Sequence, residues 1–465
     1  MDILRTVSLI SVLSMTRFLG VTELPENVFD TYENVIVSSW ETIGYTPDTE
    51  SDSISKPVMN FTECTDLYFT GVTDKAALSY AVGEDMIFTI AMHSGENLVS
   101  APYFKYEITA DDGTSVSGYT DGSSGIATLT ASCSVPGFVK VTVMPCTSEK
   151  EIVTREDIYP FYGGACAGFD KIVKSMDTPS DFDEFWAEQV KLLDNIPAYA
   201  TMQKPYENHS YSQYDVYDVS IPSINGSKPT VGYVTVPKNS AQGSLKIRVI
   251  YMGYGVASAL IIPEPGYITF CINPHGIENG MDSLYYNQYA SNELSGFGFS
   301  GNENPEESYF RDMILRDVQG VRYIKENYKY LWNGKDLEVA GASMGAFQAT
   351  AVAALMKDDI TRVILDIPWM CDLGSETKGK LGGWRPTYCS GLGYYDTVSF
   401  GKRITAPTEI TAGLGDYICP PSGVTALFNN LECEKKITFV QNRTHDYNPP
   451  KQTAYEHNRL FPCTH

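Results

Sequence analysis

The sequence predicts an α/β protein in which a small antiparallel β-sandwich precedes a larger unit with a mostly parallel sheet and helices on both faces. Two observations predict this architecture. Short strand-like stretches separated by Gly and Asp turns fill residues 67–143, a spacing typical of a sandwich. Beyond residue 164, strands alternate with helices, as they do around a parallel sheet. A chain of 465 residues is long enough for both units.

Composition narrows the function classes. The formal net charge is -23, which argues against a nucleic-acid partner because phosphate binding requires a basic face. No apolar run reaches the length of a membrane span. The ten cysteines show no Cys-x-x-Cys pair and no zinc-type spacing with histidine, so no metal or cofactor is expected. Disulfides and small buried thiols are equally good interpretations of these cysteines.

Residues 1–60 are expected to form an N-terminal segment with a signal peptide and a linker. In Met1–Met15, Arg5 precedes the apolar stretch Val7–Met15, an arrangement that favours secretion. Thr46–Ser55 is polar and acidic and is interpreted as a linker. A cytoplasmic location stays open at this point. Four Asn-x-Ser/Thr sequons, which matter only in a secreted eukaryotic protein, lie at Asn60, Asn208, Asn225 and Asn442.

Residues 61–163 are predicted to form the sandwich. Met86–Met92 and Tyr103–Thr109 read as strands, Asp111-Asp112-Gly113 as a turn, and Phe138–Val143 as a further strand. No group in this stretch is typical of catalysis. The change of pattern after Gly163-Gly164 marks the predicted start of the second unit.

Residues 164–465 are predicted to form the catalytic unit. Ser180 or Asp181 can cap a helix that runs to about Leu193. A second helix carries Ile314, Val318, Val321 and Ile324 at helical spacing. Strands are expected over residues 214–221, 230–236, 246–252, 267–272, 362–367, 408–413 and 437–441, the last of the series.

The stretch Leu337–Phe347 holds a Gly-x-Ser-x-Gly motif, with an apolar strand before it and an Ala-rich helix, Ala346–Met356, after it. This context is typical of a nucleophile elbow, in which a serine stands on a tight strand-to-helix turn. Ser343 is therefore the predicted nucleophile. The free N–H of Met344 at the start of the helix is a predicted oxyanion donor.

A serine nucleophile needs a base and a group that orients the base. In α/β-hydrolases these follow in the order Ser, acid, His. Asp416 comes just past a predicted strand, and of the three histidines after it, His445 also follows a strand, whereas His457 lies in a polar terminal segment and His465 is the last residue. Asp416 and His445 are therefore the predicted acid and base.

Neighbouring groups receive other roles. Asp446 and Cys419 are interpreted as structural. For His275, a place in the lining of the pocket and a place outside it are equally good interpretations. The turn Met252-Gly253-Tyr254 follows an earlier strand, and the N–H of Tyr254 is the predicted second oxyanion donor. The whole set predicts acyl transfer from an ester.

Several motifs extend this pattern from about Pro179 to the C-terminus. They span residues 181–186, 341–345, 366–372, 382–386, 413–423 and 444–445. Through them the chain resembles the acetyl xylan esterase / cephalosporin-C deacetylase family of α/β-hydrolases. The resemblance implies Ser343, Asp416 and His445 as the triad, oxyanion amides at Tyr254 and Met344, an acetyl-sized acyl pocket, no metal and often a homo-oligomer. The preceding sandwich resembles the immunoglobulin-like domain found before some such esterases.

The chain departs from the family pattern at three places. Met344 stands where the family has Gln, Met252-Gly253-Tyr254 stands for His-Gly-Tyr, and His275–Gly280 replaces an Arg-Gly-Gln-Gly loop. The expected function is a serine esterase that removes O-acetyl groups from carbohydrates such as xylan or xylo-oligosaccharides through an acetyl-serine intermediate. The alternatives are a general small-molecule carboxylesterase or lactonase, and a catalytically inactive carbohydrate-binding protein.

Overall fold

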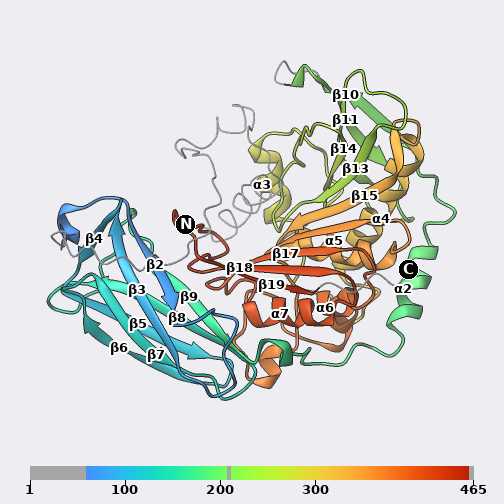
Figure 1. The fold of residues 1–465 in the computed structure, drawn as a ribbon. Coiled ribbons are helices and arrows are strands. Elements are labelled where there is room, and N and C mark those ends of the chain that lie inside the picture. Colours follow the sequence, from blue (N-terminus) through green and yellow to red (C-terminus); the bar gives the residue numbers. More distant parts are fainter. Residues whose placement is uncertain (1–58, 207–210, 460–465) are drawn as a thin grey trace.

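The computed structural model describes residues 59–206 and 211–459, and two units lie side by side in it (Figure 1). The predicted signal peptide, the linker, Asn208 and His465 lie outside the described residues. The predicted fold class is confirmed: antiparallel sheets come first along the chain, and a large mixed sheet with helices follows.

The first unit consists of two sheets. One has the order β1-β4-β3-β2 with β7 on β3, and the other has the order β6-β5-β8-β9. The sheets are antiparallel except for the short β1–β4 pairing, and the rings of Phe69 and Phe104 meet between them at 5.9 Å. The strands are β1 Met59–Asn60, β2 Leu67–Thr73, β3 Met86–Ser94, β4 Asn97–Ser100, β5 Tyr103–Ala110, β6 Ser115–Asp121, β7 Ile126–Ala131, β8 Gly137–Cys146 and β9 Phe161–Ala167.

Strand β9 spans the predicted boundary at residue 163. Phe161–Ala167 pairs with β8 along its whole length, so Gly163 and Gly164 lie in the middle of a strand of the first unit. A Cβ on Gly164 would lie 2.2 Å from the carbonyl oxygen of Val139 on β8. The glycine pair therefore serves close packing within this strand.

The second unit is built on a ten-stranded sheet of order β10-β11-β12-β14-β13-β15-β16-β17-β18-β19. Strands β14, β13, β15, β16, β17 and β18 run parallel, and antiparallel strands flank them. The strands are β10 Met202–Pro205, β11 Tyr214–Ile221, β12 Thr230–Pro237, β13 Leu245–Tyr251, β14 Tyr267–Asn273, β15 Trp332–Ala342, β16 Arg362–Asp366, β17 Thr408–Gly413, β18 Lys435–Val440 and β19 Ala454–Arg459.

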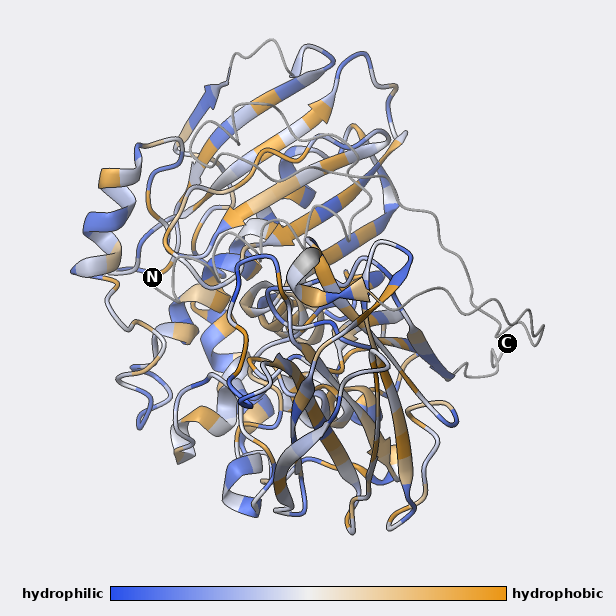
Figure 2. Cartoon of the chain, turned by 90° about the vertical axis from the view of Figure 1, so that its left-hand side faces the viewer, coloured by the Kyte–Doolittle hydropathy of each residue, from blue (hydrophilic) through white to orange (hydrophobic). Residues whose placement is uncertain are grey.

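Apolar side chains along these strands form the core (Figure 2). Helix α5 packs on β13, β15 and β16, and α4 and α6 pack on α5. On the opposite face, a second apolar cluster lies under the segment 259–262. The helices are α2 Phe182–Lys191, α3 Ser283–Ser291, α4 Tyr309–Asn327, α5 Met344–Leu355, α6 Thr397–Gly401 and α7 Pro421–Asn430, with 3-10 turns η2 Phe61–Glu63, η3 Phe169–Lys171, η5 Ser375–Lys378 and η6 Ser390–Tyr395.

One expectation about the end of the sheet is wrong. Residues 437–441 are not the last strand, because Ala454–Arg459 pairs antiparallel with β18 as β19 and carries His457. The segment is polar because an edge strand keeps one face in water. The nine cysteines in the described ranges are free thiols, and eight of them are buried. None of the described helices is long and apolar enough to cross a membrane.

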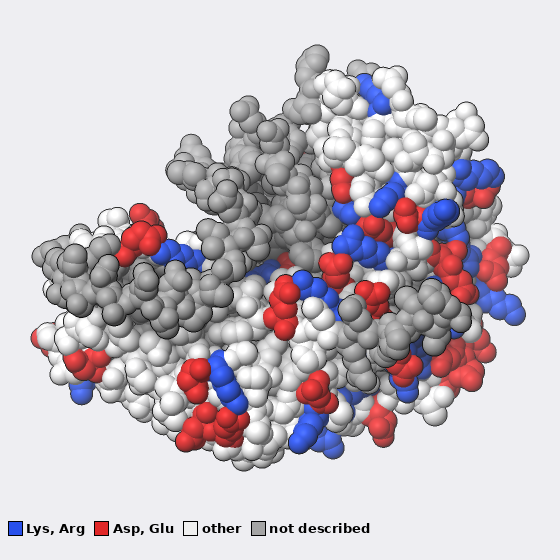
Figure 3. Space-filling model, viewed as in Figure 1, with Lys and Arg blue, Asp and Glu red and all other residues white. Residues whose placement is uncertain are grey.

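Acidic and basic side chains are intermixed on the face shown in Figure 3. The described residues visible on that face form no continuous basic stripe for a phosphate backbone.

Candidate active site

Ser343 lies on a sharp turn between β15 and α5, at the carboxyl end of the parallel strands. Its φ of 55° and ψ of -121° are strained for a residue with a side chain, as a nucleophile elbow requires. The glycines on either side are needed for space. A Cβ on Gly341 would lie 2.2 Å from the Gly345 carbonyl, and one on Gly345 would lie 2.1 Å from the Tyr251 carbonyl oxygen.

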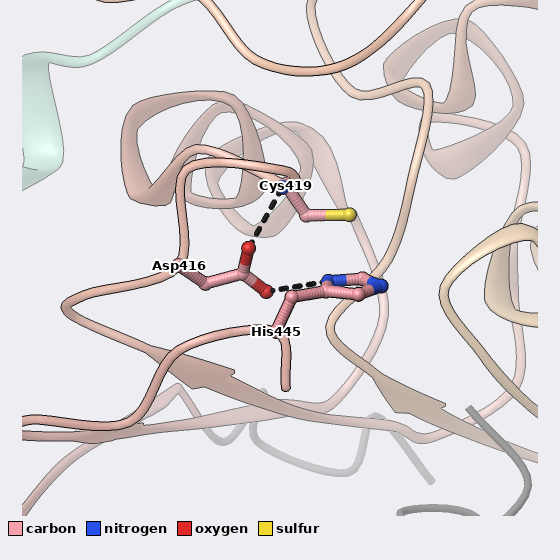
Figure 4. Close-up of side chains that lie close together, drawn as sticks. All are labelled: Asp416, Cys419 and His445. Carbon is pink, nitrogen blue, oxygen red and sulfur yellow. Dashed lines mark hydrogen bonds and ion pairs between the residues drawn. The ribbon is translucent and has the colours of Figure 1, made fainter. Parts of the chain in front are cut away.

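Asp416 and His445 meet beyond the ends of β17 and β18 (Figure 4). Nδ1–H of His445 donates to Oδ2 of Asp416 at 3.0 Å. The other carboxylate oxygen accepts from the N–H groups of Ile418 and Cys419, at 3.0 and 2.9 Å. Both side chains are buried. Asp446, the neighbour of His445, is exposed. Asp416 therefore orients the imidazole and presents its Nε2 as the basic atom.

The environment of His445 favours its protonated form. Burial alone would lower the pKa of the imidazole, but the Asp416 carboxylate, through its charge and its hydrogen bond, raises that pKa above the ordinary value of 6.5. The charges of Asp446 and Asp366 act in the same direction. A histidine in this environment takes up a proton more readily than one in water.

The structure does not join Ser343 to His445 by a hydrogen bond. Nε2 of His445 is buried and has no hydrogen-bond partner among the described residues. The Ser343 hydroxyl lies beside the thiol of Cys419. Nucleophile–base bonds are often long in uncomplexed enzymes and shorten when substrate binds. We therefore expect the hydrogen bond between the serine hydroxyl and the imidazole to form when substrate binds.

Asp416, Cys419 and His445 also have metal-ligand atoms within 4.8 Å of one another (Figure 4). These donors fit a soft divalent ion such as Zn²⁺, but each is otherwise engaged. Asp416 and His445 bond to each other. Burial, followed by the charges of Asp416 and Cys371, raises the pKa of the Cys419 thiol well above its usual value. A protonated, buried thiol is a weak ligand and a weak nucleophile.

The two predicted oxyanion amides follow the ends of the neighbouring strands β13 and β15. In the described part of the chain, neither the N–H of Tyr254 nor that of Met344 donates a hydrogen bond to the backbone. Side chains on both sides hold the turn that carries Tyr254. Nε2 of Gln348 donates to the Met252 carbonyl at 2.9 Å, and Nε2 of His275 donates to the Gly255 carbonyl at 2.7 Å.

The side chain of His275 is fully buried. Its Nδ1 accepts from the hydroxyl of Tyr309 at 2.7 Å. Burial lowers the pKa of His275 to about 3, so the ring stays neutral and keeps its Nε2 proton for Gly255 at any working pH. His275 therefore supports the turn that carries Tyr254.

Aromatic rings surround Tyr254. Its ring stacks on Phe297 at 4.4 Å and meets the edge of Trp384 at 4.7 Å. Phe299 lies 5.0 Å from Trp384 and is 41% exposed, whereas Trp369 is buried behind Trp384. The row of rings thus runs from the buried Trp369 through Trp384 to the exposed Phe299, beside the candidate oxyanion turn. We call the exposed end at Phe299 the rim of the site.

A buried ion pair connects the loop of His445 to the turn of Ser343. The guanidinium of Arg443, two residues before His445, donates to both carboxylate oxygens of Asp366 at 2.8 Å. The carbonyl of Asp366 accepts from the N–H of Ser343 at 2.9 Å. Sequence reasoning missed Gln348, Arg443 and Asp366, and an apolar helix with one buried Gln was the signal available for the first of them.

A cavity of about 720 Å³ lies elsewhere, between α2, α4 and the end of α5. None of the predicted site residues lines it.

The chain was compared with known proteins. The family described as Acetyl xylan esterase (AXE1) matches residues 170–378 and 387–461. The curated Acetyl esterase Axe7A of Xylanibacter ruminicola is 24% identical over 288 residues, which cover 57% of this chain and 63% of the relative. The matched region thus spans less than two thirds of that relative's length.

Two solved structures are also similar to this chain. The acetyl xylan esterase from Paenibacillus sp. R4 is 19% identical with a TM-score of 0.48, over 60% of this chain and 93% of its own. Acetyl xylan esterase 1 from Thermoanaerobacterium sp. JW/SL YS485 is 18% identical with a TM-score of 0.48, over 60% and 92%. Because the family match covers more than half of the chain, this protein belongs to the acetyl xylan esterase family.

Proposed function

We propose that this protein is a serine esterase that removes O-acetyl groups from acetylated carbohydrates such as xylan or xylo-oligosaccharides. The observation that carries the proposal is the buried Asp416–His445 pair at strand ends beside the elbow serine, in a chain of this family. The substrate class comes from the names of the family and of its relatives.

In the first half of the reaction, Oγ of Ser343 attacks the acetyl carbonyl carbon while Nε2 of His445 takes the hydroxyl proton. Negative charge grows on the carbonyl oxygen, and the N–H groups of Tyr254 and Met344 stabilise it. The bond from carbon to the sugar oxygen then breaks. His445 returns the proton to that oxygen, and the deacetylated sugar leaves an acetyl-Ser343.

In the second half, water attacks the acetyl-serine as His445 removes one of its protons. The same amides stabilise the second oxyanion. When the bond to Oγ breaks, Ser343 regains its proton from His445, and acetic acid leaves and ionises to acetate in water. Asp416 keeps Nδ1 protonated and stabilises the imidazolium in both halves.

The test is release of acetate from acetylated xylo-oligosaccharides by the purified protein and by its Ser343→Ala variant. We expect release by the wild type and a loss of at least about 10³-fold in the variant, as for other triad members. Hydrolysis of p-nitrophenyl acetate without release from the oligosaccharides would support a general carboxylesterase instead. No turnover of either ester would support an inactive carbohydrate-binding protein.

Three further properties belong to the same proposal. The sandwich is an immunoglobulin-like domain, because β2-β3-β7 and β6-β5-β8-β9 correspond to the A-B-E and C′-C-F-G orders of that fold. The protein is secreted and forms a homo-oligomer. N-terminal sequencing of the protein from its native host tests the secretion, and light scattering after size-exclusion chromatography tests the assembly.

A further inference from the structure

The free edge of β9 is occupied by two side chains of the other unit. Oε1 of Gln441 accepts from the N–H of Gly164 at 2.9 Å, and its Nε2 donates to the Gly164 carbonyl at 3.0 Å. Oδ1 of Asn442 accepts from the N–H of Tyr162 at 2.9 Å. Alternate residues of β9 thus bond outward to amide groups, as they would to a neighbouring strand. These two side chains close the edge at Tyr162 and Gly164, and further along the strand the N–H of Cys166 donates to the Ala77 carbonyl.

Asn442 also reaches the other sheet of the sandwich. Its Nδ2 donates to the Phe69 carbonyl on β2 at 2.9 Å. Both Oδ1 and Nδ2 of the side chain are therefore bonded to the sandwich. Both Gln441 and Asn442 are only 2% exposed. The backbone of Asn442 has a φ of 58°, a left-handed conformation that asparagine tolerates better than most residues. A glycan on this sequon would have no room.

The docked residues lead directly to the base. Gln441 and Asn442 follow β18, and His445 comes three residues later. Between them, the carbonyl of Arg443 accepts from the N–H of Gly415 at 3.0 Å, and Gly415 immediately precedes Asp416. The loop of the base and the loop of the acid are therefore bonded to each other within a residue or two of the groups that react.

The sandwich contacts the acid loop as well. A Cβ on Gly415 would lie 2.0 Å from the carbonyl oxygen of Tyr162, so the two backbones touch. Tyr162 thus bonds to Asn442 through its N–H and packs on Gly415 through its carbonyl. Figure 1 shows the corresponding arrangement, with β9 of the sandwich next to the strands β18 and β19.

We propose that the β-sandwich is a working part of the esterase site: its strand β9, through Gln441 and Asn442, positions the loops that carry His445 and Asp416. Gln441 and Asn442 are positioning residues, since they act through the two loops. A displacement of about 1 Å in a catalytic group can lower a rate by about 10²-fold. A free loop end has no such restraint. The proposal rests on the proposed esterase function.

The test uses two substitutions in the full chain. Gln441→Met keeps the side-chain volume and removes both bonds to Gly164. Asn442→Gly keeps the left-handed backbone at no steric cost and removes the bonds to Tyr162 and Phe69. Lys451→Met is the matched control, because it breaks a different contact between the units, the exposed Lys451–Glu96 ion pair. Each protein is assayed with p-nitrophenyl acetate over a range of pH, and its fold is checked by circular dichroism and thermal unfolding.

We expect both variants to stay folded and to lose about 10- to 100-fold in kcat, with KM nearly unchanged. The acid limb of kcat/KM should also move to lower pH, because His445 loses part of its contact with Asp416. A purely structural role would lower the melting temperature and leave both quantities unchanged. The Lys451→Met control should match the wild type.

Folded variants with kcat within about twofold of the wild type would overturn the proposal, as would an equal loss in the control. Should Asn442→Gly fail to fold, Gln441→Met decides alone. Suppose that the wild type is active, that Ser343→Ala is inactive, and that Gln441→Met and Asn442→Gly are as active as the wild type. This result would refute the inference and leave the esterase function intact. An inactive wild type would refute the esterase function itself.

Discussion

The two halves of the candidate site are held in different ways. On the side of Ser343, the groups that hold the turn around Tyr254 belong to the same α/β unit as the serine, and they are Gln348 and His275. On the acid–base side, the loops before His445 and Asp416 lean on the sandwich through Asn442 and Gly415. The Ser343 side is thus held by contacts within the α/β unit, whereas the His445 and Asp416 side also has contacts with the sandwich.

This difference follows from where each half lies in the sheet. Ser343 leaves a central strand, β15, which has neighbours on both sides and α5 packed on it. His445 and Asp416 follow β18 and β17, closer to the sheet edge, where fewer elements of the same unit are available. Loops at a sheet edge are the more mobile parts of a fold unless something packs on them. The Arg443–Asp366 pair then connects the two halves.

The largest expected effect comes from breaking the acid–base half directly. Asp416→Asn should lower kcat by about 10⁴-fold, as the equivalent change does in trypsin-like enzymes, because the imidazole loses its orienting carboxylate. In the wild type, the base works only when neutral, so activity is present above the pKa of His445 and is lost as pH falls through it. Because that pKa is raised, the acid limb of kcat/KM should lie above pH 6.5, and it should move lower in the variant.

The matched control is Asp446→Asn, a carboxylate next to His445 in sequence but exposed. It should keep kcat within about twofold of the wild type. The measurement is kcat/KM for p-nitrophenyl acetate against pH for the three proteins. A larger loss of kcat/KM in Asp446→Asn than in Asp416→Asn would show that Asp446, and not Asp416, is the acid.

The nucleophile half should respond more weakly. Gln348→Met removes the hydrogen bond to the Met252 carbonyl and keeps the volume of a fully buried side chain. Oε1 of Gln348 has no described partner, so no acceptor bond is lost. A looser oxyanion turn should cost about 10- to 10²-fold in kcat, less than the about 10²–10³-fold loss of a whole donor. The acid limb should stay in place, unlike that of Asn442→Gly, and an acid limb that moves would contradict the separation of the two halves.

Sequence reasoning could place the groups at strand ends. Ser343, Asp416 and His445 each follow a strand with a clear apolar pattern, and the structure brings the acid and base together. Their catalytic roles remain a prediction. The same rule places Asp416 near His445, because the carboxyl ends of neighbouring parallel strands share one edge.

Contacts between distant segments could not be predicted in this way. The bonds of Gln441 and Asn442 to β9 connect residues 277 to 280 positions apart, and no local pattern encodes them. Asn442 appeared only as a sequon, and Gly163-Gly164 only as a change of pattern. Two adjacent glycines in a strand are nevertheless a sign of close backbone approach. Similarly, β19 was missed because the side chains that suit an edge strand depend on its tertiary surroundings and not on a local pattern.

The smallest effect should appear at the rim of the site, outside both halves. Phe299 is 41% exposed and packs its ring on Trp384, next to Tyr254. An open aromatic ring at this position suits contact with the alcohol part of an ester rather than with its acetyl group.

Phe299→Ala should therefore raise KM for acetylated xylo-oligosaccharides by about 3- to 10-fold, the range expected for losing one partly exposed contact. KM and kcat for p-nitrophenyl acetate should change little, because its alcohol part is small. Val116→Ala is a suitable control, since Val116 is also an exposed apolar residue, at 51%, but lies on β6 of the sandwich. An equal rise in KM for both substrates would mean that Phe299 shapes the acetyl pocket itself, and the rim would then belong to the nucleophile half.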